Sequence, residues 1–242
     1  MSNVFPAKPL RSQRKNLAII NLCALRLCPQ DPADGIIVFC EIKKNQFNQR
    51  FMSLSHQQLN ALATKFGTPL YVYDAAHITA QYQKLTNAFA QTDTKFFYAC
   101  KALTNINILK HIKNIGCNVD CSSINEVKMA FLAGFEAKNI LYTSNGIHFT
   151  EIEEAQNLGV HINIDSLRNL EKFGQKFGHS YPVGIRLRPN IMGGGNLKVS
   201  TGHDKSKFGI PVDQLDKILL LVSEYNLHIQ NLHIHTGSDI KD

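Results

Sequence analysis

Lys101 directly follows the apolar run "FFYAC" and has no acidic residue near it in sequence. Two interpretations of such a lysine are equally open from spacing alone. The side chain could extend its charged end to solvent along apolar surface. Alternatively, a dry setting could favour the neutral amine, which is the nucleophile that Schiff-base chemistry needs. Lys101 is therefore the first candidate catalytic residue. The residues that surround it decide between a solvent-directed side chain and a nucleophilic amine.

A second group of candidate residues lies near the end of the chain. His233 and His235 are two apart in "HIHTGS" and would share one face of a strand. Such a pair could bind a divalent metal ion, stack on a planar cofactor or serve as packed structural residues. Ser238 and the backbone N–H groups of the turn are suited to a phosphate. Arg186, inside the run "VGIRLR", needs an anionic or aromatic-oxygen partner if it is enclosed.

The elements that would position these residues repeat along the chain. Short β-branched or aromatic runs begin near residues 95, 117, 139, 160 and 182, and a sixth covers "HIQNLHIHT". Helical patterns lie between them. Ser123 to Glu126 predicts a capped helix that stops at Gly134, Thr150 to Glu153 predicts one that stops at Gly159, and a third lies near 212–226. Strands alternating with helices predict parallel βαβ units.

The predicted fold is therefore α/β, an incomplete (β/α)8 TIM-type barrel with about six of eight strands. A doubly wound sheet is less favoured because no GxGxxG follows the first strand. The first and last strands should have open edges. Because barrel active sites lie at the carboxyl ends of strands, the last polar residues of the six strands should meet at one mouth. They are Lys101, Asp120, Ser144 with Asn145, Asp165, Arg186 with Arg188, and His233 with His235.

Composition restricts the classes of partner. The net charge of +7 is concentrated in residues 1–50, which carry +5, so the remaining 192 residues are nearly balanced. We therefore expect no nucleic-acid partner. Residues 17–27 form an apolar run that is too short to span a bilayer and is interrupted by Arg26, so we expect neither a membrane partner nor secretion. The six cysteines form no CxxC pair, which favours buried free thiols in a reducing cytoplasm and no metal site.

Several stretches together resemble the fold-type III pyridoxal-phosphate decarboxylases, in particular their diaminopimelate branch. In chain order, these stretches are "FGTPLYVYD" (66–74), "FYACKA" (97–102), "VDCSSINE" (119–126), "AGFEAKNILYTSNG" (133–146), "GVHINIDSLRNLE" (159–171), "STGHDKSKFGI" (200–210) and "LHIHTGS" (232–238). The combination is specific, and "STG" followed by "SKFGI" favours the diaminopimelate branch over the ornithine and arginine branches. The loop sequence "IMGGGNLKVSTGH" differs from the loop sequence that is commoner in this family.

The resemblance implies a role for each matching position. Lys101 would hold pyridoxal 5'-phosphate covalently, His235 would stack on its pyridine ring, and Ser238 would contact its phosphate. Arg186 looks like the arginine near the phenolic oxygen of the cofactor. Asp120 and Glu126 match acidic positions of the same motif, although the helix cap alone would account for Glu126.

The implied function is decarboxylation of meso-diaminopimelate to L-lysine in lysine biosynthesis, by a cytoplasmic homodimer acting on a small amino acid. The resemblance covers residues 52–242 as a truncated cofactor-binding barrel. Residues 1–51 form a poorly matched extension, which we expect to be partly disordered. The family's later phosphate loop, its acidic partner of the pyridine nitrogen and its C-terminal β-domain are not matched, so independent activity is doubtful. Alternatives are a non-catalytic cofactor-binding protein, another basic amino-acid decarboxylase, or a metal-dependent barrel hydrolase that uses the two histidines.

Overall fold

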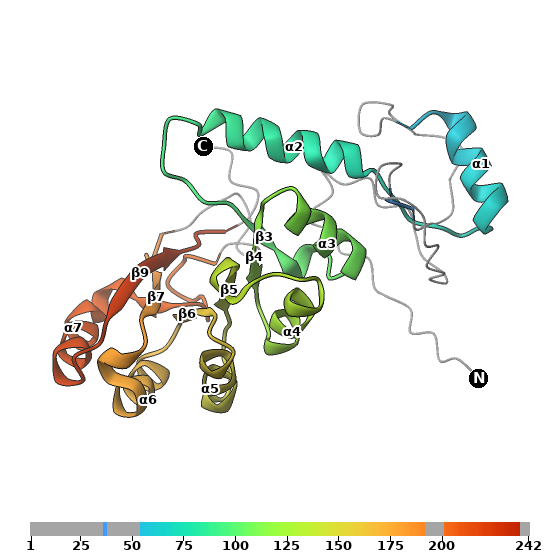
Figure 1. The fold of residues 1–242 in the computed structure, drawn as a ribbon. Coiled ribbons are helices and arrows are strands. Elements are labelled where there is room, and N and C mark those ends of the chain that lie inside the picture. The colour runs from blue at the N-terminus through green and yellow to red at the C-terminus, as the bar shows by residue number, and fades with distance from the viewer. Residues whose placement is uncertain (1–35, 38–53, 192–200, 238–242) are drawn as a thin grey trace. The chain divides into compact units, whose positions relative to one another are not determined.

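The computed structural model describes residues 36–37, 54–191 and 201–237 (Figure 1). The chain divides into two compact units, Met1–Thr94 and Lys95–Asp242. Each unit is described by itself below. The expectation of partial disorder in residues 1–51 falls, except for Ile36 and Ile37, outside the described residues.

The first unit contains two helices and two short paired strands among its described residues. Helix α1 (His56–Phe66) begins with a complete capping box between Ser55 and Gln58 and ends at Gly67. Strand β2 (Val72–Tyr73) follows and pairs antiparallel with β1 (Ile36–Ile37), and helix α2 (Ala75–Ala88) comes next. A small core of Leu59, Leu70 and Val72 holds α1 against the strand.

The second unit is built on a parallel sheet whose six main strands are those predicted from the repeat. They are β3 (Phe97–Ala99), β4 (Asn118–Cys121), β5 (Ile140–Thr143), β6 (His161–Ile164), β7 (Val183–Arg188) and β9 (Ile229–Ile234). The strands pair in chain order, and β9 pairs with β7. A short strand that the sequence did not predict, β8 (Ile210–Pro211), pairs with the end of β7. The sheet does not close into a barrel, because β3 and β9 each pair with only one strand among the described residues.

Five helices accompany this sheet and lie next to one another along it (Figure 1). They are α3 (Ile106–Asn114), α4 (Ile124–Leu132), α5 (Phe149–Asn157), α6 (Leu167–Phe177) and α7 (Leu215–Glu224). Side-chain caps begin four of them, at Asn105, Ser123, His148 and Ser166. The prediction that Thr150 begins α5 is wrong, because the His148 ring accepts the Thr150 N–H and begins the helix two residues earlier.

The core of the second unit lies between the sheet and these helices. Tyr142, Leu170, Phe173 and Val119 are fully buried there, as expected for parallel strands that are covered on both faces. The expectation of free buried thiols is confirmed for the three cysteines within the described residues, which are Cys100, Cys117 and Cys121. The outer face of the edge strand β9 is less covered, and Leu232 and Ile234 are 64% and 53% exposed.

Among the described helices, none combines the length and the apolar character that a bilayer crossing requires.

Helix α6 approaches α7 closely because residue 174 has no side chain. A methyl group on Gly174 would lie 2.6 Å from ring atoms of Tyr225, the residue that ends α7. In an open helix, replacing glycine by alanine stabilises the folded state by about 0.5–1 kcal/mol. Here the same change forces a collision with a ring held close to its backbone. The sign of the effect therefore reports on the packing of the two helices.

We predict that Gly174→Ala lowers the free energy of unfolding by about 1–3 kcal/mol, the usual cost of overpacking. Urea denaturation followed by circular dichroism measures it. In a Tyr225→Ala background, where the ring is absent, the same substitution should be neutral or stabilising. A stabilising Gly174→Ala in the unaltered chain would contradict the observed packing.

Candidate active site

Lys101 lies in the short 3-10 helix η3 (Cys100–Ala102), directly after β3, at the carboxyl end of the sheet. Its side chain is exposed, so the dry setting considered from the sequence is wrong. The ammonium group still acts on the site, because its charge affects the pKa of Asp120, of His233 and of His235. Within the described part of the chain, Lys101 Nζ has no hydrogen bond or ion pair. The amine is therefore accessible and lies beside the other candidate residues.

Asp120 is the acidic residue next to this lysine. It lies on β4, where its register partner is Ala99 of β3. Burial raises the pKa of Asp120 to about 6, and Glu126 adds to this shift. A hydrogen bond from Thr143 and the charges of Lys101 and Arg186 oppose it. Its Oδ1 atom is buried and has no hydrogen-bond partner among the described residues, so one carboxylate oxygen remains free for a ligand.

Arg186 is enclosed in the sheet beneath the loop that follows β7. It is only 6% exposed, and its guanidinium carbon lies 4.6 Å from the ring centroid of Phe208. This is the geometry of a cation–π contact. Burial lowers the pKa of Arg186, while the carboxylates of Asp165 and Asp120 raise it. The buried cation thus has an aromatic face on one side and two acidic groups near it.

His233 in β9 and His235 directly after it have lowered pKa values, which favours their neutral rings. His233 is the register partner of Arg186, and burial, followed by the charge of Arg186, lowers its pKa to about 4. Burial also lowers the pKa of His235, with Lys101 and Arg186 contributing. The Gly237 N–H donates to His235 Nδ1 at 3.1 Å, so the proton of the neutral ring lies on Nε2. His233 Nδ1 is buried and lacks a partner among the described residues.

Among the described residues, the histidine pair does not belong to a group of three or more side chains that could hold a metal ion. Three or more His, Cys, Asp or Glu side chains that could share a metal ion are found nowhere in the described ranges. The backbone donor at His235 also occupies the ring nitrogen that faces the turn. A neutral ring with a fixed tautomer is instead suited to stacking against a planar group.

The remaining residues predicted at the mouth include Asn145 and Asp165, which hydrogen-bond neighbouring strand ends and loops. Asn145 donates to Asp165 at 2.6 Å and to the Lys207 carbonyl at 3.0 Å, which joins the end of β5 to the loop before β8. Asp165 also accepts from the Gly146 N–H at 3.4 Å. Ser144 is buried, with only 4% of its surface exposed. Glu126 accepts from the Ser122 N–H at 2.6 Å, as a helix-terminal residue.

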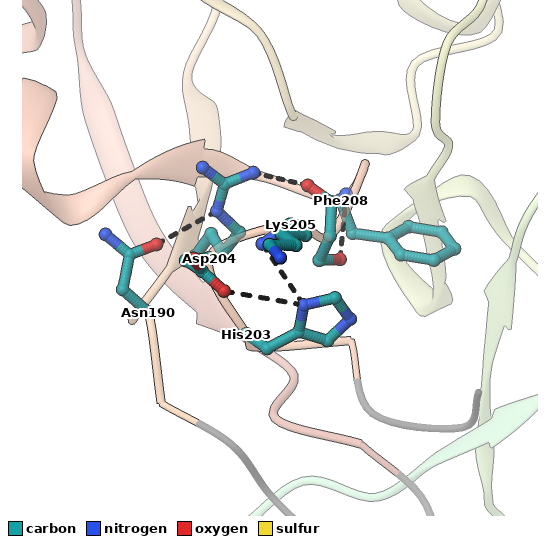
Figure 2. Close-up of polar contacts among 7 residues, drawn as sticks. Asn190, His203, Asp204, Lys205 and Phe208 are labelled. Atoms are coloured by element: carbon teal, nitrogen blue, oxygen red, sulfur yellow. Dashed lines mark hydrogen bonds and ion pairs between the residues drawn. The ribbon is translucent and has the colours of Figure 1, made fainter. Parts of the chain in front are cut away.

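Arg188 differs from Arg186 in that it holds the loop. Its Nε donates to Asn190 Oδ1 at 3.0 Å and its Nη1 donates to the Ser206 carbonyl. The Phe208 N–H donates to Ser206 Oγ at 3.2 Å. Figure 2 shows these contacts between the end of β7 and the loop that carries His203 to Phe208. Arg188 therefore fixes the loop that places the Phe208 ring over Arg186.

The structure brings several of the strand ends named from the sequence within electrostatic reach of one another, and the residues beneath them were not named from the sequence. Lys101, Asp120, Arg186, His233 and His235 interact electrostatically, as expected for one mouth. Ser238 lies outside the described residues. Phe208 and the polar residues beneath the mouth, Thr143, Asn163 and Asn231, were not predicted. The signal was available, because Asn163 and Asn231 lie two positions before Asp165 and His233 and so share their strand faces.

Comparisons with known proteins agree with this geometry. A family model described as "Pyridoxal-dependent decarboxylase, pyridoxal binding domain" matches residues 75–242. A diaminopimelate decarboxylase from Methanothermobacter thermautotrophicus is 33% identical over 183 residues, which are 75% of this chain and 43% of that protein. The chain thus spans less than half the length of this curated relative.

Solved structures show the same fold. Diaminopimelate decarboxylase from Helicobacter pylori, complexed with L-lysine, matches with a TM-score of 0.70 and 29% identity, over 76% of this chain and 48% of that one. A lysine/ornithine decarboxylase from Vibrio vulnificus, complexed with putrescine, matches with a TM-score of 0.63 and 25% identity, over 76% and 47%. The predicted α/β barrel-type fold is therefore confirmed.

The raised pKa of Asp120 makes stability depend on pH in a definite direction. Between its unfolded value near 4 and the folded value of about 6, the folded chain binds more protons at this group than the unfolded chain. The protonated group therefore contributes stability below about pH 4, and this contribution is lost as the pH rises through 6. His233, with its lowered pKa, acts in the opposite direction over the same range. A variant at Asp120 alone separates its contribution to stability from that of His233.

We predict that Asp120→Asn is about as stable as the unaltered chain at pH 4 and more stable by about 1–2 kcal/mol at pH 7, allowing for partial exposure. Urea denaturation at intervals from pH 4 to pH 7 measures the difference, in which the His233 contribution largely cancels. Asp213→Asn, at an exposed aspartate, is the matched control for the chemical change. A difference that does not grow with pH would contradict the assignment.

Proposed function

Because the chain belongs to the pyridoxal-dependent decarboxylases, whose pyridoxal-binding domain matches most of it, we propose that it is the cofactor-binding part of a decarboxylase acting on meso-diaminopimelate. The observation that carries the proposal is the placement of an accessible lysine next to Asp120, Arg186 and two neutral histidines at one end of a parallel sheet. The motif "SKFGI", which places Phe208 over Arg186, supports the diaminopimelate branch.

The residues of the site fit the cofactor. Asp120 Oδ1 and His233 Nδ1 are buried polar atoms without partners among the described residues. Buried polar atoms usually have a hydrogen-bond partner, so both are suited to contact a bound group. When bound, pyridoxal phosphate supplies the electron sink that allows a carboxylate to leave as carbon dioxide. Lys101 supplies the amine that attaches it, and the exposed position of that amine leaves room for a substrate amine to replace it.

The residues around Lys101 would orient the bound cofactor and shield it from water. The neutral ring of His235, with Nδ1 engaged by the Gly237 N–H, offers a flat face of fixed orientation. Arg186 is held beneath Phe208 and can donate to an anionic oxygen without moving. The charge of Lys101 lowers the pKa of Asp120, so the two groups interact electrostatically. We assign Ser238 to the phosphate on the resemblance alone.

The substrate class follows from the family branch. The neighbours that resemble the chain act on dibasic or diamino acids, according to their names. Basic amino-acid decarboxylation of another kind, on lysine or ornithine, is the second candidate, and the Vibrio vulnificus structure favours it. A protein that binds the cofactor without turnover is the third. A homodimer, in a cytoplasmic setting, is part of the proposal.

We predict that borohydride reduction of the chain incubated with pyridoxal phosphate labels the peptide that contains Lys101, as peptide mapping by mass spectrometry would show. Lys101→Ala should lose this label. Lys110→Ala, at an exposed lysine of α3, is the matched control and should retain it. Labelling spread equally over exposed lysines, or unchanged in Lys101→Ala, would contradict the assigned attachment site.

We further predict that, of the amino acids offered with the cofactor, meso-diaminopimelate releases carbon dioxide fastest. L-Ornithine, L-lysine and L-arginine at equal concentration should release at least about tenfold less, because a site built for two carboxylates loses one contact with each of them. Release from L-ornithine above that from meso-diaminopimelate would favour the second candidate. Labelling of Lys101 without any release would favour cofactor binding alone.

A further inference from the structure

His235 lies just beyond the strand pairing that would hold its backbone. Strand β9 ends at Ile234, and the last register pair between β9 and β7 joins Ile234 to Leu187. Hydrogen bonds to a neighbouring strand fix a residue inside such a pairing, whereas a residue after it depends on other contacts. The orientation of the His235 ring must therefore come from outside the pairing of β9 with β7.

Thr201 and Gly202, which lie before β8, supply these contacts. Thr201 Oγ1 donates to the His235 carbonyl at 2.8 Å, although 34 positions separate the two residues. The N–H groups of Thr201 and Gly202 both donate to the Thr236 carbonyl, at 3.1 and 3.0 Å. Two consecutive carbonyls of the turn after β9 are thus held by two consecutive residues of a distant loop.

Gly202 allows the two backbones to lie this close. A Cβ atom at residue 202 would lie 2.9 Å from the Ile191 carbonyl oxygen and 3.0 Å from Thr236 Cα. Both are backbone atoms, which cannot move aside as the end of a flexible side chain can. The glycine is buried and has no left-handed backbone angle. Its role is therefore the absence of a side chain at the point of closest approach.

The Thr201 hydroxyl also contacts the ring of His235. Its Oγ1 lies 3.3 Å from His235 Nδ1, and the Gly237 N–H donates to the same nitrogen at 3.1 Å. Because the single hydroxyl proton is donated to the His235 carbonyl, Nδ1 accepts from Gly237. Contacts at a ring nitrogen restrict the rotation of the ring and leave its faces available for stacking.

A purely structural explanation would be that these contacts only hold the loop closed. The two N–H donors to the Thr236 carbonyl would serve that purpose, and almost any residue at position 201 supplies such an N–H. The hydroxyl is different, because only threonine or serine offers one in this position. It is used on the residue that carries the ring and lies beside the ring nitrogen. The loop contact alone therefore does not account for the side chain of Thr201.

We propose that Thr201 is a positioning residue that orients the His235 ring for stacking on the cofactor, and that Gly202 provides the close approach this requires. The role of the ring rests on the proposed function, whereas the hold of Thr201 on the turn does not. Loss of the hydroxyl should let the turn open more often, by about fivefold, the usual effect of one hydrogen bond.

The first test is hydrogen exchange of the Gly237 amide, followed by NMR of the 15N-labelled chain without cofactor. Thr201→Val keeps the shape and loses the hydroxyl, so exchange should be about fivefold faster. Thr201→Ser should restore it. Thr92→Val is the matched control, because the Thr92 hydroxyl donates to the Phe89 carbonyl at the same 2.8 Å. Unchanged exchange in Thr201→Val, shown by circular dichroism to be folded, overturns the proposal.

The second test is a double-mutant cycle on cofactor affinity, measured by absorbance titration with pyridoxal phosphate. Thr201→Val should raise the apparent Kd by about fivefold, and Thr201→Ser should restore it. In a His235→Ala background, where no ring remains to be oriented, Thr201→Val should cause no further rise. Gly202→Ala should raise the Kd at least as much as Thr201→Val, and the Thr201 variants keep the test valid if Gly202→Ala does not fold.

The two tests together separate this proposal from the proposed function. An equal rise in Kd with and without the His235 ring overturns the proposal, because the hydroxyl would then act elsewhere. Faster exchange of Gly237 with an unchanged Kd overturns the orienting role. If the unaltered chain binds no cofactor but its exchange responds to Thr201→Val, the proposed function fails and the hold on the turn stands. Cofactor binding and exchange that are both unchanged in Thr201→Val remove this proposal and leave the proposed function intact.

Discussion

Strand β7 is the element on which the arrangement of the site depends. It pairs with β6, with β9 and, at its carboxyl end, with β8. This pairing fixes the register of Gly184 and Arg186 against Asn163 on one side and against Asn231 and His233 on the other. Parallel strands held in register present their carboxyl ends together. The site is therefore a consequence of backbone hydrogen bonds before any side-chain contact is made.

Desolvation gives the side chains at these strand ends their chemical character. Burial raises the pKa of Asp120 and lowers those of His233 and His235, so it moves all three toward their neutral forms. Arg186 retains a cationic centre because Phe208 and two carboxylates surround it. The site therefore combines neutral histidine rings with a buried cation that is partly balanced by nearby carboxylates.

Sequence patterns predicted the parts of this structure that follow from local physics. The strand repeat located all six main strands, and the pattern at Ser123 predicted the cap of α4, because apolar periodicity and helix capping depend on neighbouring residues. The cap of α5 was misplaced, since the nitrogen of His148 can replace the oxygen that usually accepts there. Strand β8 was missed because two residues carry no periodicity. The sequence left the exposure of Lys101 open, because that exposure depends on how the chain turns after β3.

The support beneath the mouth shows a different limit of sequence reasoning. The types of Asn163, Thr143 and Gly184 carry no chemical signal by themselves, and a glycine in a strand is more often taken as a bulge or a weak point. Their meaning arises only from register, which places the three residues in one row although 20 or more residues separate neighbouring members. A strand residue two positions before a candidate catalytic residue is its neighbour on the same face.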